Sequence, residues 1–163
     1  MSKKINLLET GNMLLAAQKI VLCCHVSPDG DTLGSTLGLA RFLEKAGKKV
    51  TVFADDDINK SLNFIPGIEK VQRPEAGVTV EADLFVVVDA SSFDRVGICN
   101  EVVKAPVLLN IDHHISNTEF ADYLYLDAEA AAAGEIMCDL FEAMGWEYDE
   151  AIAIDFYTAI TTD

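Results

Sequence analysis

All three histidines of the chain lie in two short polar stretches that also contain aspartates. The first stretch is His25-Val26-Ser27-Pro28-Asp29-Gly30-Asp31, and the second is the triplet Asp112-His113-His114. A further carboxylate, Asp89, follows the apolar run 84–88. Imidazole and carboxylate ligands together suit manganese, iron or zinc, whereas carboxylates alone would suit magnesium or calcium. These residue types therefore predict a site for divalent transition metals.

The spacing of these residues indicates how they could share two ions. Asp29 and Asp31 flank a glycine, so on a tight turn they could face neighbouring ions. Adjacent histidines in extended structure point to opposite sides, so we expect only one of His113 and His114 to be a ligand. Asp89 could bridge two ions, which lie about 3.5–4 Å apart in two-metal sites and activate a water molecule between them. The alternative for the first stretch is an Asp-Gly turn with a helix-capping aspartate.

Each candidate site follows an apolar run that predicts a buried strand, and helical patterns separate the strands. The predicted strands are Lys19–His25, Lys49–Ala54, Asp83–Asp89, Val107–Asp112 and Tyr123–Leu126. The predicted helices are Ile5–Ala17, 32–46, the short Cys99–Lys104, Ala130–Met144, and a last one from Asp149 to Thr161 or beyond. This alternation predicts an α/β fold, a doubly wound, mainly parallel five-stranded sheet with helices on both faces. Ligands bind at the carboxyl ends of the strands in such sheets.

The composition limits the class of protein and its partners. A chain of 163 residues, half of them apolar, fits one domain over residues 1–163. The formal net charge of −15 argues against long duplex nucleic acid, but it permits a short nucleotide held by metal ions. There is no apolar run long enough for a bilayer and no signal-peptide pattern. Four cysteines without C-x-x-C spacing fit a reducing cytoplasm and make a thiolate zinc site improbable.

Four stretches together resemble the motifs of the DHH phosphoesterase family. HVSPDGDTLGS at 25–35 is similar to the family signature HxxPDGDxxGS, and VVVDAS at 86–91 resembles the second motif. Asp112-His113-His114 is the triplet that names the family, and TAITTD at 158–163 resembles the fourth motif, which ends in a metal-binding aspartate. Their order and spacing agree over essentially the whole chain. The chain most resembles the branch of oligoribonucleases and 3′-phosphoadenosine-5′-phosphate phosphatases, which shares its core with RecJ-type exonucleases.

The resemblance implies two divalent ions, usually manganese, with a hydroxide between them that attacks phosphorus. It implies that one ion is held by His25, Asp29 and Asp89. It implies that the second ion is held by Asp31, Asp89, His113 and Asp163. His114 would contact the scissile phosphate or assist proton transfer, and Asp112 would orient the triplet. Ser35 and the helix start beside it could hold a phosphate.

The resemblance also implies the partners of the chain and leaves alternatives open. The expected substrates are short oligonucleotides such as pApA, and 3′-phosphoadenosine 5′-phosphate. A homodimer is one option for the assembly, and the sequence does not fix the oligomeric state. A manganese pyrophosphatase on the same fold, or a nucleotide-binding regulatory module without hydrolysis, are the alternatives. Family members carry a second domain that grips the nucleotide. The chain ends at Asp163, so we expect a fragment of a longer protein.

Overall fold

The computed structural model describes residues 1–163, and its centre is a seven-stranded, entirely parallel sheet. The strand order is β1-β9-β8-β6-β2-β3-β4. The five longer strands are β2 (Lys19–Cys23), β3 (Lys49–Phe53), β6 (Leu84–Val88), β8 (Leu108–Asp112) and β9 (Tyr123–Leu126). The outer strands β1 (Lys3–Lys4) and β4 (Val71–Gln72) have two residues each, and β5 (Val80–Glu81) pairs separately with β7 (Val103–Lys104).

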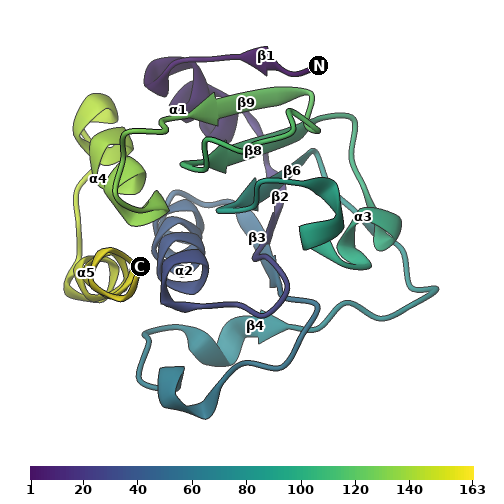
Figure 1. Ribbon diagram of the computed structural model, residues 1–163, viewed down its shortest axis with the longest axis horizontal. Coiled ribbons are helices and arrows are strands. Elements are labelled where there is room, and N and C mark those ends of the chain that lie inside the picture. Colours follow the sequence, from purple (N-terminus) through teal and green to yellow (C-terminus); the bar gives the residue numbers. More distant parts are fainter.

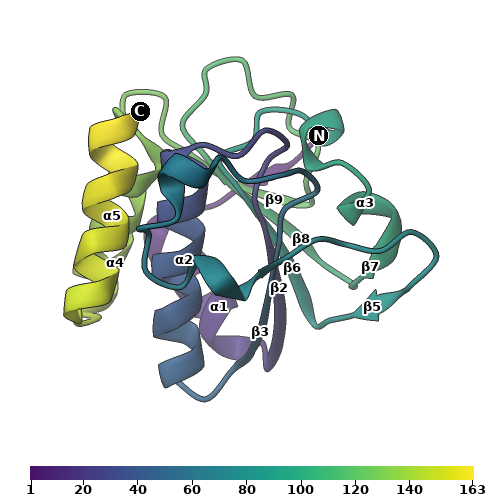
Figure 2. The same ribbon diagram turned by 90° about the horizontal axis from the view of Figure 1, so that it is seen from below.

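The two faces of the sheet are covered unequally (Figures 1 and 2). One face carries the long helices α1 (Leu7–Ala16), α2 (Gly30–Lys45) and α4 (Ala133–Met144), with α5 (Glu150–Thr162) packed outside α2 and α4. The other face carries the short helix α3 (Cys99–Val102), the 3-10 helix η3 (Phe93–Val96) and the β5–β7 pair. Two further 3-10 turns, η1 (Lys60–Leu62) and η2 (Ile68–Lys70), lie between β3 and β4.

Strand β2 shows why apolar runs without polar interruptions form this sheet. Ile20 and Leu22 belong to the larger core under α1, α2 and α4, whereas Val21 and Cys23 belong to the smaller core under α3. Because side chains alternate between the two faces of a strand, a strand covered on both faces must be apolar at every position. The larger core, with 27 buried residues against 10, explains why most helices lie on one side.

The path of the chain creates a switch point beside β2. From β2 the chain passes through α2 to β3 on one side, and then returns to β6 on the other side of β2. Connections therefore leave neighbouring strands in opposite directions at the carboxyl ends of β2 and β6, and open α/β sheets bind ligands at such a point. His25 and Asp89 lie just after these two strand ends.

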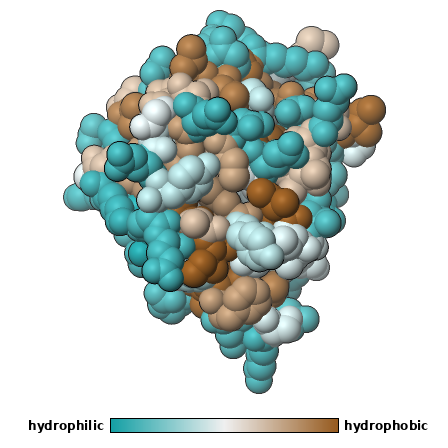
Figure 3. Space-filling view, turned by 90° about the vertical axis from the view of Figure 1, so that its left-hand side faces the viewer, coloured by the Kyte–Doolittle hydropathy of each residue, from teal (hydrophilic) through white to brown (hydrophobic).

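The predicted α/β class is confirmed, and the sheet is larger than the five strands expected. β1 and β4 extend its edges, and predicted element bounds shift by one to three residues, as in α4, which begins at Ala133 rather than Ala130. No helix in the structure is both long and apolar enough to cross a bilayer. Figure 3 shows the α4–α5 side, where apolar patches interrupt the hydrophilic surface. On α5 the exposed apolar residues are Ile154, Tyr157 and Ile160.

Helix α5 lies unusually close to α2, and this contact places the end of the chain at the site. A Cβ atom on Gly34 would lie 2.3 Å from the carbonyl oxygen of Asp155, and one on Gly38 would lie 2.4 Å from the Phe156 ring. Glycines on α2 therefore permit a backbone approach that side chains would block. As a result, α5 runs alongside α2 and delivers Asp163 to the carboxyl edge of the sheet.

The α2–α5 contact buries an unpaired carboxylate, which predicts a pH-dependent stability. Both side-chain oxygens of Asp155 lack hydrogen-bond partners. Burial raises the pKa of Asp155 to about 8. The positive charge of Arg41 lowers this pKa, and the negative charges of Asp149 and Glu69 raise it further. Because the folded pKa exceeds the unfolded value, this group stabilises the fold below about pH 4, and that stability is lost as the pH rises to about 8.

We therefore expect Asp155→Asn to stabilise the protein at neutral and alkaline pH. Relative to the parent chain, its free energy of unfolding should rise by about 1–3 kcal/mol between pH 4 and pH 8, because asparagine neither takes up a proton on folding nor buries a charge. Urea unfolding at several pH values measures this. Glu142→Gln, an exposed change of the same charge on α4, serves as the control. If the difference in the free energy of unfolding between Asp155→Asn and the parent chain does not vary with pH, the prediction is contradicted.

Candidate metal centre

The predicted ligands from four separate segments meet at the carboxyl edge of the sheet, around Asp89. The Nε2 atom of His25 lies 3.6 Å from Asp29 Oδ1 and 3.6 Å from Asp89 Oδ2. The Nε2 atom of His113 lies 3.2 Å from the other oxygen of Asp89. It also lies 3.5 Å from Asp31 Oδ2 and 3.7 Å from Asp163 Oδ2. Asp89 thus offers one oxygen to each histidine.

The backbone at Asp89 explains how its carboxylate reaches the centre of this cluster. Asp89 follows β6 directly, and its amide donates to the carbonyl of Ile111 at 2.9 Å. Its φ of 65° lies in the left-handed region, which aspartate enters more readily than most residues. The chain therefore turns sharply at Asp89, and its side chain, 2 % exposed, is buried between the two histidines.

Both His25 and His113 are held by a backbone carbonyl on the far side of the ring. The Nδ1 atom of His25 lies 2.6 Å from the carbonyl oxygen of Val26, and that of His113 lies 3.3 Å from the carbonyl oxygen of Ala130. A carbonyl can only accept, so each Nδ1 carries the proton when neutral and each Nε2 presents its lone pair to the carboxylates. This is the arrangement usual for metal-binding histidines.

Asp29 and Asp31 each have a second, structural role at a helix start. Asp29 caps α2, where its Oδ1 accepts from the amide of Thr32 at 3.0 Å. Asp31 accepts from the amides of Ala133 and Gly134 at 2.9 and 3.0 Å, so its carboxylate lies at the N-terminus of α4. The helix-capping role expected as an alternative for this turn is therefore present at Asp29. Asp29 and Asp31 still have lone pairs that a cation could use.

The expected phosphate-binding role of Ser35 is not supported by its surroundings. Ser35 is fully buried, and its hydroxyl donates to Asp31 Oδ1 at 3.2 Å. The first turn of α2 is capped by Asp29, so it does not present an open anion site. A serine one turn into a helix reaches back to a side chain at i−4 as readily as to a ligand, so the motif alone does not assign Ser35 to a phosphate.

The triplet is arranged differently from the expectation for two extended neighbours. Strand β8 ends at Asp112, so the alternation of a strand no longer applies, and the rings of His113 and His114 lie with centroids 4.5 Å apart. His114 Nδ1 lies 2.6 Å from Asp112 Oδ1, which leaves its Nε2 atom free. His114 Nδ1 also lies 3.8 Å from Asp89 Oδ1, the same oxygen that His113 Nε2 approaches, so both imidazoles lie beside one oxygen of Asp89.

Two asparagines that the sequence analysis did not single out fix this triplet. Asn117 donates to Asp112 Oδ2 at 2.7 Å and to Asn110 Oδ1 at 2.8 Å. Asn110 is buried and donates to the carbonyls of Val87 and Ala90, which flank Asp89. Asn110 could have been found in the sequence, because it is a polar residue inside the apolar run of β8. Asn117, on the following loop, had no such signal.

The pKa values show how strongly the carboxylates and imidazoles interact. Burial by itself lowers the pKa of His25, but the neighbouring carboxylates of Asp29 and Asp89 outweigh it and raise that pKa to about 10. The carboxylate of Asp89 raises the pKa of His113 to about 9. Burial, and then the charge of Asp89, raise the pKa of Asp31 to about 7. Protons here partly offset the negative charge, and a cation would displace them.

The polar atoms left without hydrogen bonds fit a bound cation. Asp89 Oδ1 and His113 Nε2 are buried, face each other at 3.2 Å and have no hydrogen-bond partner. Buried polar atoms rarely remain unpaired, and a cation that displaces the proton of His113 would find a lone pair on each of these two atoms. Three groups of donor atoms, each within 4.8 Å, could hold an ion: His25, Asp29 and Asp89; Asp31, His113 and Asp163; Asp89, His113 and His114.

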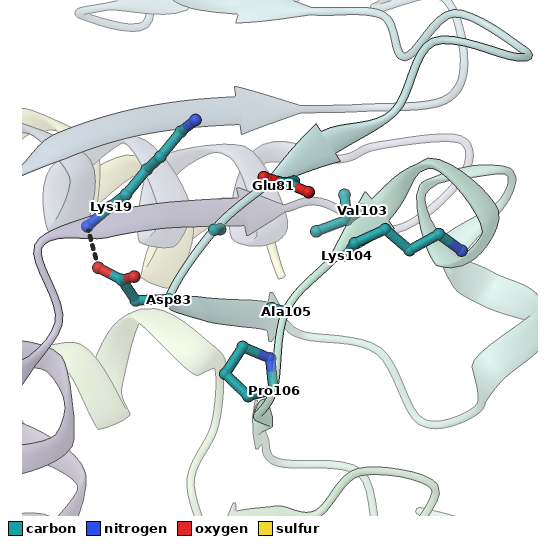
Figure 4. Close-up of a pocket in the computed structure, with 8 residues that line it drawn as sticks. Lys19, Glu81, Asp83, Val103, Lys104, Ala105 and Pro106 are labelled. Atoms are coloured by element: carbon teal, nitrogen blue, oxygen red, sulfur yellow. Dashed lines mark hydrogen bonds between the residues drawn. The ribbon is translucent and has the colours of Figure 1, made fainter.

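The most voluminous cavity of the structure lies away from this centre. It holds about 600 Å³ at the amino ends of β2 and β6, and its residues are shown in Figure 4. Its charged lining residues are Lys19, Lys104, Glu81 and Asp83, and the Asp83 carboxylate accepts from the backbone amides of Gln18 and Lys19. Two cationic and two anionic side chains line this cavity and no imidazole does, so the chemistry of the chain is assigned to the opposite edge.

The fold and this cluster define an α/β protein with acidic and imidazole ligands at a sheet switch point. The family model described as "DHH family, N-terminal domain" matches residues 19–161, and the chain belongs to that family. It is 35% identical over 147 residues to the "Bifunctional oligoribonuclease and PAP phosphatase NrnA" of Thermus thermophilus, over 88% of this chain and 43% of that protein.

A solved structure and a more distant relative agree with this membership. An exopolyphosphatase-related protein from Bacteroides fragilis superposes with a TM-score of 0.84 at 26% identity, over 93% of this chain and 48% of that chain. A "Probable manganese-dependent inorganic pyrophosphatase" from Listeria welshimeri is 24% identical, over 89% of this chain and 48% of that protein. The chain thus spans about half the length of these relatives.

Proposed function

We propose that this chain is the catalytic domain of a metal-dependent phosphoesterase that hydrolyses short oligonucleotides and 3′-phosphoadenosine 5′-phosphate. The observation that carries the proposal is the position of Asp89, whose two oxygens face the Nε2 atoms of His25 and His113. The name of the Thermus thermophilus relative supports this choice of substrates. The matched length supports a longer protein with a second domain after residues 1–163.

We assign the residues of the cluster to two cations, for which Mn²⁺ is the proposed metal. His25, Asp29 and Asp89 form the first set of ligands. The second set shares Asp89 and adds Asp31, His113 and Asp163. The mixture of imidazole and carboxylate donors suits Mn²⁺, and the name of the Listeria welshimeri relative supports the same metal. Asp89 is then the bridge.

The remaining residues of the triplet are assigned to substrate and proton handling. Bound divalent cations supply Lewis acidity toward a phosphate and make a water molecule more acidic. Asp112 accepts from His114 Nδ1 and fixes the ring, so that His114 Nε2 faces outward with a side chain 42 % exposed. His114 can therefore contact the scissile phosphate or donate a proton to the leaving oxygen. Asn117 holds Asp112 in place through its amide.

The proposal is tested with the purified chain, and with any longer protein of which it is part. We expect release of AMP from pApA, and of phosphate from 3′-phosphoadenosine 5′-phosphate, in the presence of Mn²⁺. A chelator should abolish both reactions, and added Mn²⁺ should restore them. Absence of turnover with two ions bound per chain would contradict the proposal and would favour a nucleotide-binding module without hydrolysis.

A manganese pyrophosphatase is the second candidate, because the Listeria welshimeri relative carries that name. Release of phosphate from pyrophosphate, compared with release of AMP from pApA under the same conditions, separates the two activities. The cytoplasm is the proposed compartment, since all four cysteines are free thiols in the structure. A homodimer stays an untested option for the assembly.

A further inference from the structure

Beside the cluster of acids lies one guanidinium that no carboxylate neutralises. Arg95 is an exposed residue of η3, six residues after Asp89. One of its terminal nitrogens lies 3.2 Å from His25 Nδ1, and no acidic oxygen lies within 4.0 Å of the guanidinium. By comparison, Arg73 is paired with Asp55 and Asp57. In a chain with a net charge of −15, an unpaired cation at the site is unexpected.

The backbone keeps Arg95 at this position. The carbonyl oxygen of Arg95 accepts from the amide of Val26 at 2.8 Å, so η3 is attached to the residue that follows His25. Val96, the next residue, is fully buried in the smaller core. The backbone of Arg95 is therefore fixed next to the first motif, and its long side chain alone is free to move.

The 3.2 Å contact between Arg95 and His25 does not satisfy the donors of the guanidinium. His25 Nδ1 carries a proton, which it donates to the carbonyl of Val26 at 2.6 Å, and it keeps that proton when Nε2 holds a cation. A guanidinium has only donors, so it has no acceptor on a protonated Nδ1. The guanidinium of Arg95 therefore has donors without an acceptor on His25, at the edge of the cluster.

An anionic substrate supplies the acceptors that these donors lack. Five carboxylates surround the site, and even two divalent cations would not neutralise all of them: the aspartates are Asp29, Asp31, Asp89, Asp112 and Asp163. A phosphate therefore needs an additional positive group to offset their repulsion. Guanidinium groups bind phosphate through two parallel hydrogen bonds, a geometry that a water molecule or an ammonium does not reproduce.

We propose that Arg95 binds a phosphate group of the substrate on the His25 side of the metal centre. This inference rests on the proposed function and names a substrate-binding residue for it. The substrate class that fits is a nucleotide or oligonucleotide with a phosphate available to a bidentate donor. Arg95 acts on the phosphate directly.

The first test measures phosphate binding without requiring turnover. Inorganic phosphate is titrated calorimetrically into the Mn²⁺-loaded chain and into its Arg95→Gln, Arg95→Lys and Arg73→Gln variants, with bound manganese counted in each. Arg95→Gln should weaken phosphate binding about 10- to 100-fold, as expected for lost hydrogen bonds between charged groups. The phosphate affinity of Arg95→Lys should lie between those of the parent and Arg95→Gln, because an ammonium keeps the charge but not the paired donors. Arg73→Gln should match the parent.

The second test uses hydrolysis of pApA and separates the two proposals. A raised KM in Arg95→Gln, with two ions still bound, supports a role in phosphate binding. Unchanged phosphate affinity in Arg95→Gln would overturn the inference even if the parent chain is active. Loss of an ion in that variant would overturn it too, since Arg95 would then act through His25. If the parent chain does not hydrolyse pApA but Arg95→Gln still weakens phosphate binding, the proposed hydrolysis is refuted and the role of Arg95 in phosphate binding is kept.

Discussion

Replacing Asp89 by alanine is expected to abolish hydrolysis and to reduce the number of bound ions at both sets of ligands. Asp89 faces His25 with one oxygen and His113 with the other, so its removal deprives each cation of a ligand. It also removes the group that would hold the two cations together. We expect a fall in kcat/KM of at least about a thousandfold, since both ions contribute to stabilising charge on the phosphate. Elemental analysis of the purified variant gives the ion count.

Two controls separate this effect from a change in folding. Asp89→Asn keeps a residue type that tolerates the positive φ of this position, so it removes the charge with little backbone strain. Asp94→Ala removes an exposed aspartate from the same loop. The first should lose metal and activity, and the second should keep both. An Asp89→Ala variant that still binds two ions with parental affinity would refute the bridging role.

Replacing His114 by alanine is expected to slow hydrolysis while both ions stay bound. Its Nδ1 atom is engaged by Asp112, and its exposed edge points outward, so we assign it to the substrate and not to a cation. Loss of a proton donor or phosphate contact should lower kcat about 10²- to 10⁴-fold. Single-turnover hydrolysis and the manganese content of the same samples measure both quantities.

The division of roles within the triplet depends on this result. His114 Nδ1 lies 3.8 Å from Asp89 Oδ1, and Asp89, His113 and His114 together form one of the possible ion sites. Loss of one ion from His114→Ala would therefore assign His114 to a cation and contradict the proposal. Ile115→Ala, at the neighbouring position with a side chain that is 90% exposed, is the control that should leave rate and metal content unchanged.

The architecture could be predicted from the sequence wherever burial decides it. Strands such as β6, with five apolar residues in a row, have few alternatives to the centre of a parallel sheet. The strand β1 was missed because Lys3 and Lys4 carry no apolar pattern, and only the pairing with Tyr123 and Leu124 makes them a strand. The β5–β7 pair was missed for the same reason, since two-residue strands depend on contacts distant in the sequence.

The candidate site could be predicted as a set of residues but not as an arrangement. Strand order at the switch point brings His25 and Asp89 together, as the positions of strand ends implied. The relative orientation of His113 and His114 could not be predicted, because it depends on where β8 ends. The position of Arg95 depends on a hydrogen bond between segments about 70 residues apart, and no local pattern encodes that contact.

The central claim is that Asp89 joins two cations, and a crystal soaked in Mn²⁺ tests it most directly. Anomalous scattering at the manganese edge should show two peaks about 3.5–4 Å apart, one on each side of the Asp89 carboxylate. The peaks should contact His25 and His113 respectively. A single peak, or two peaks that do not share Asp89, would contradict the account.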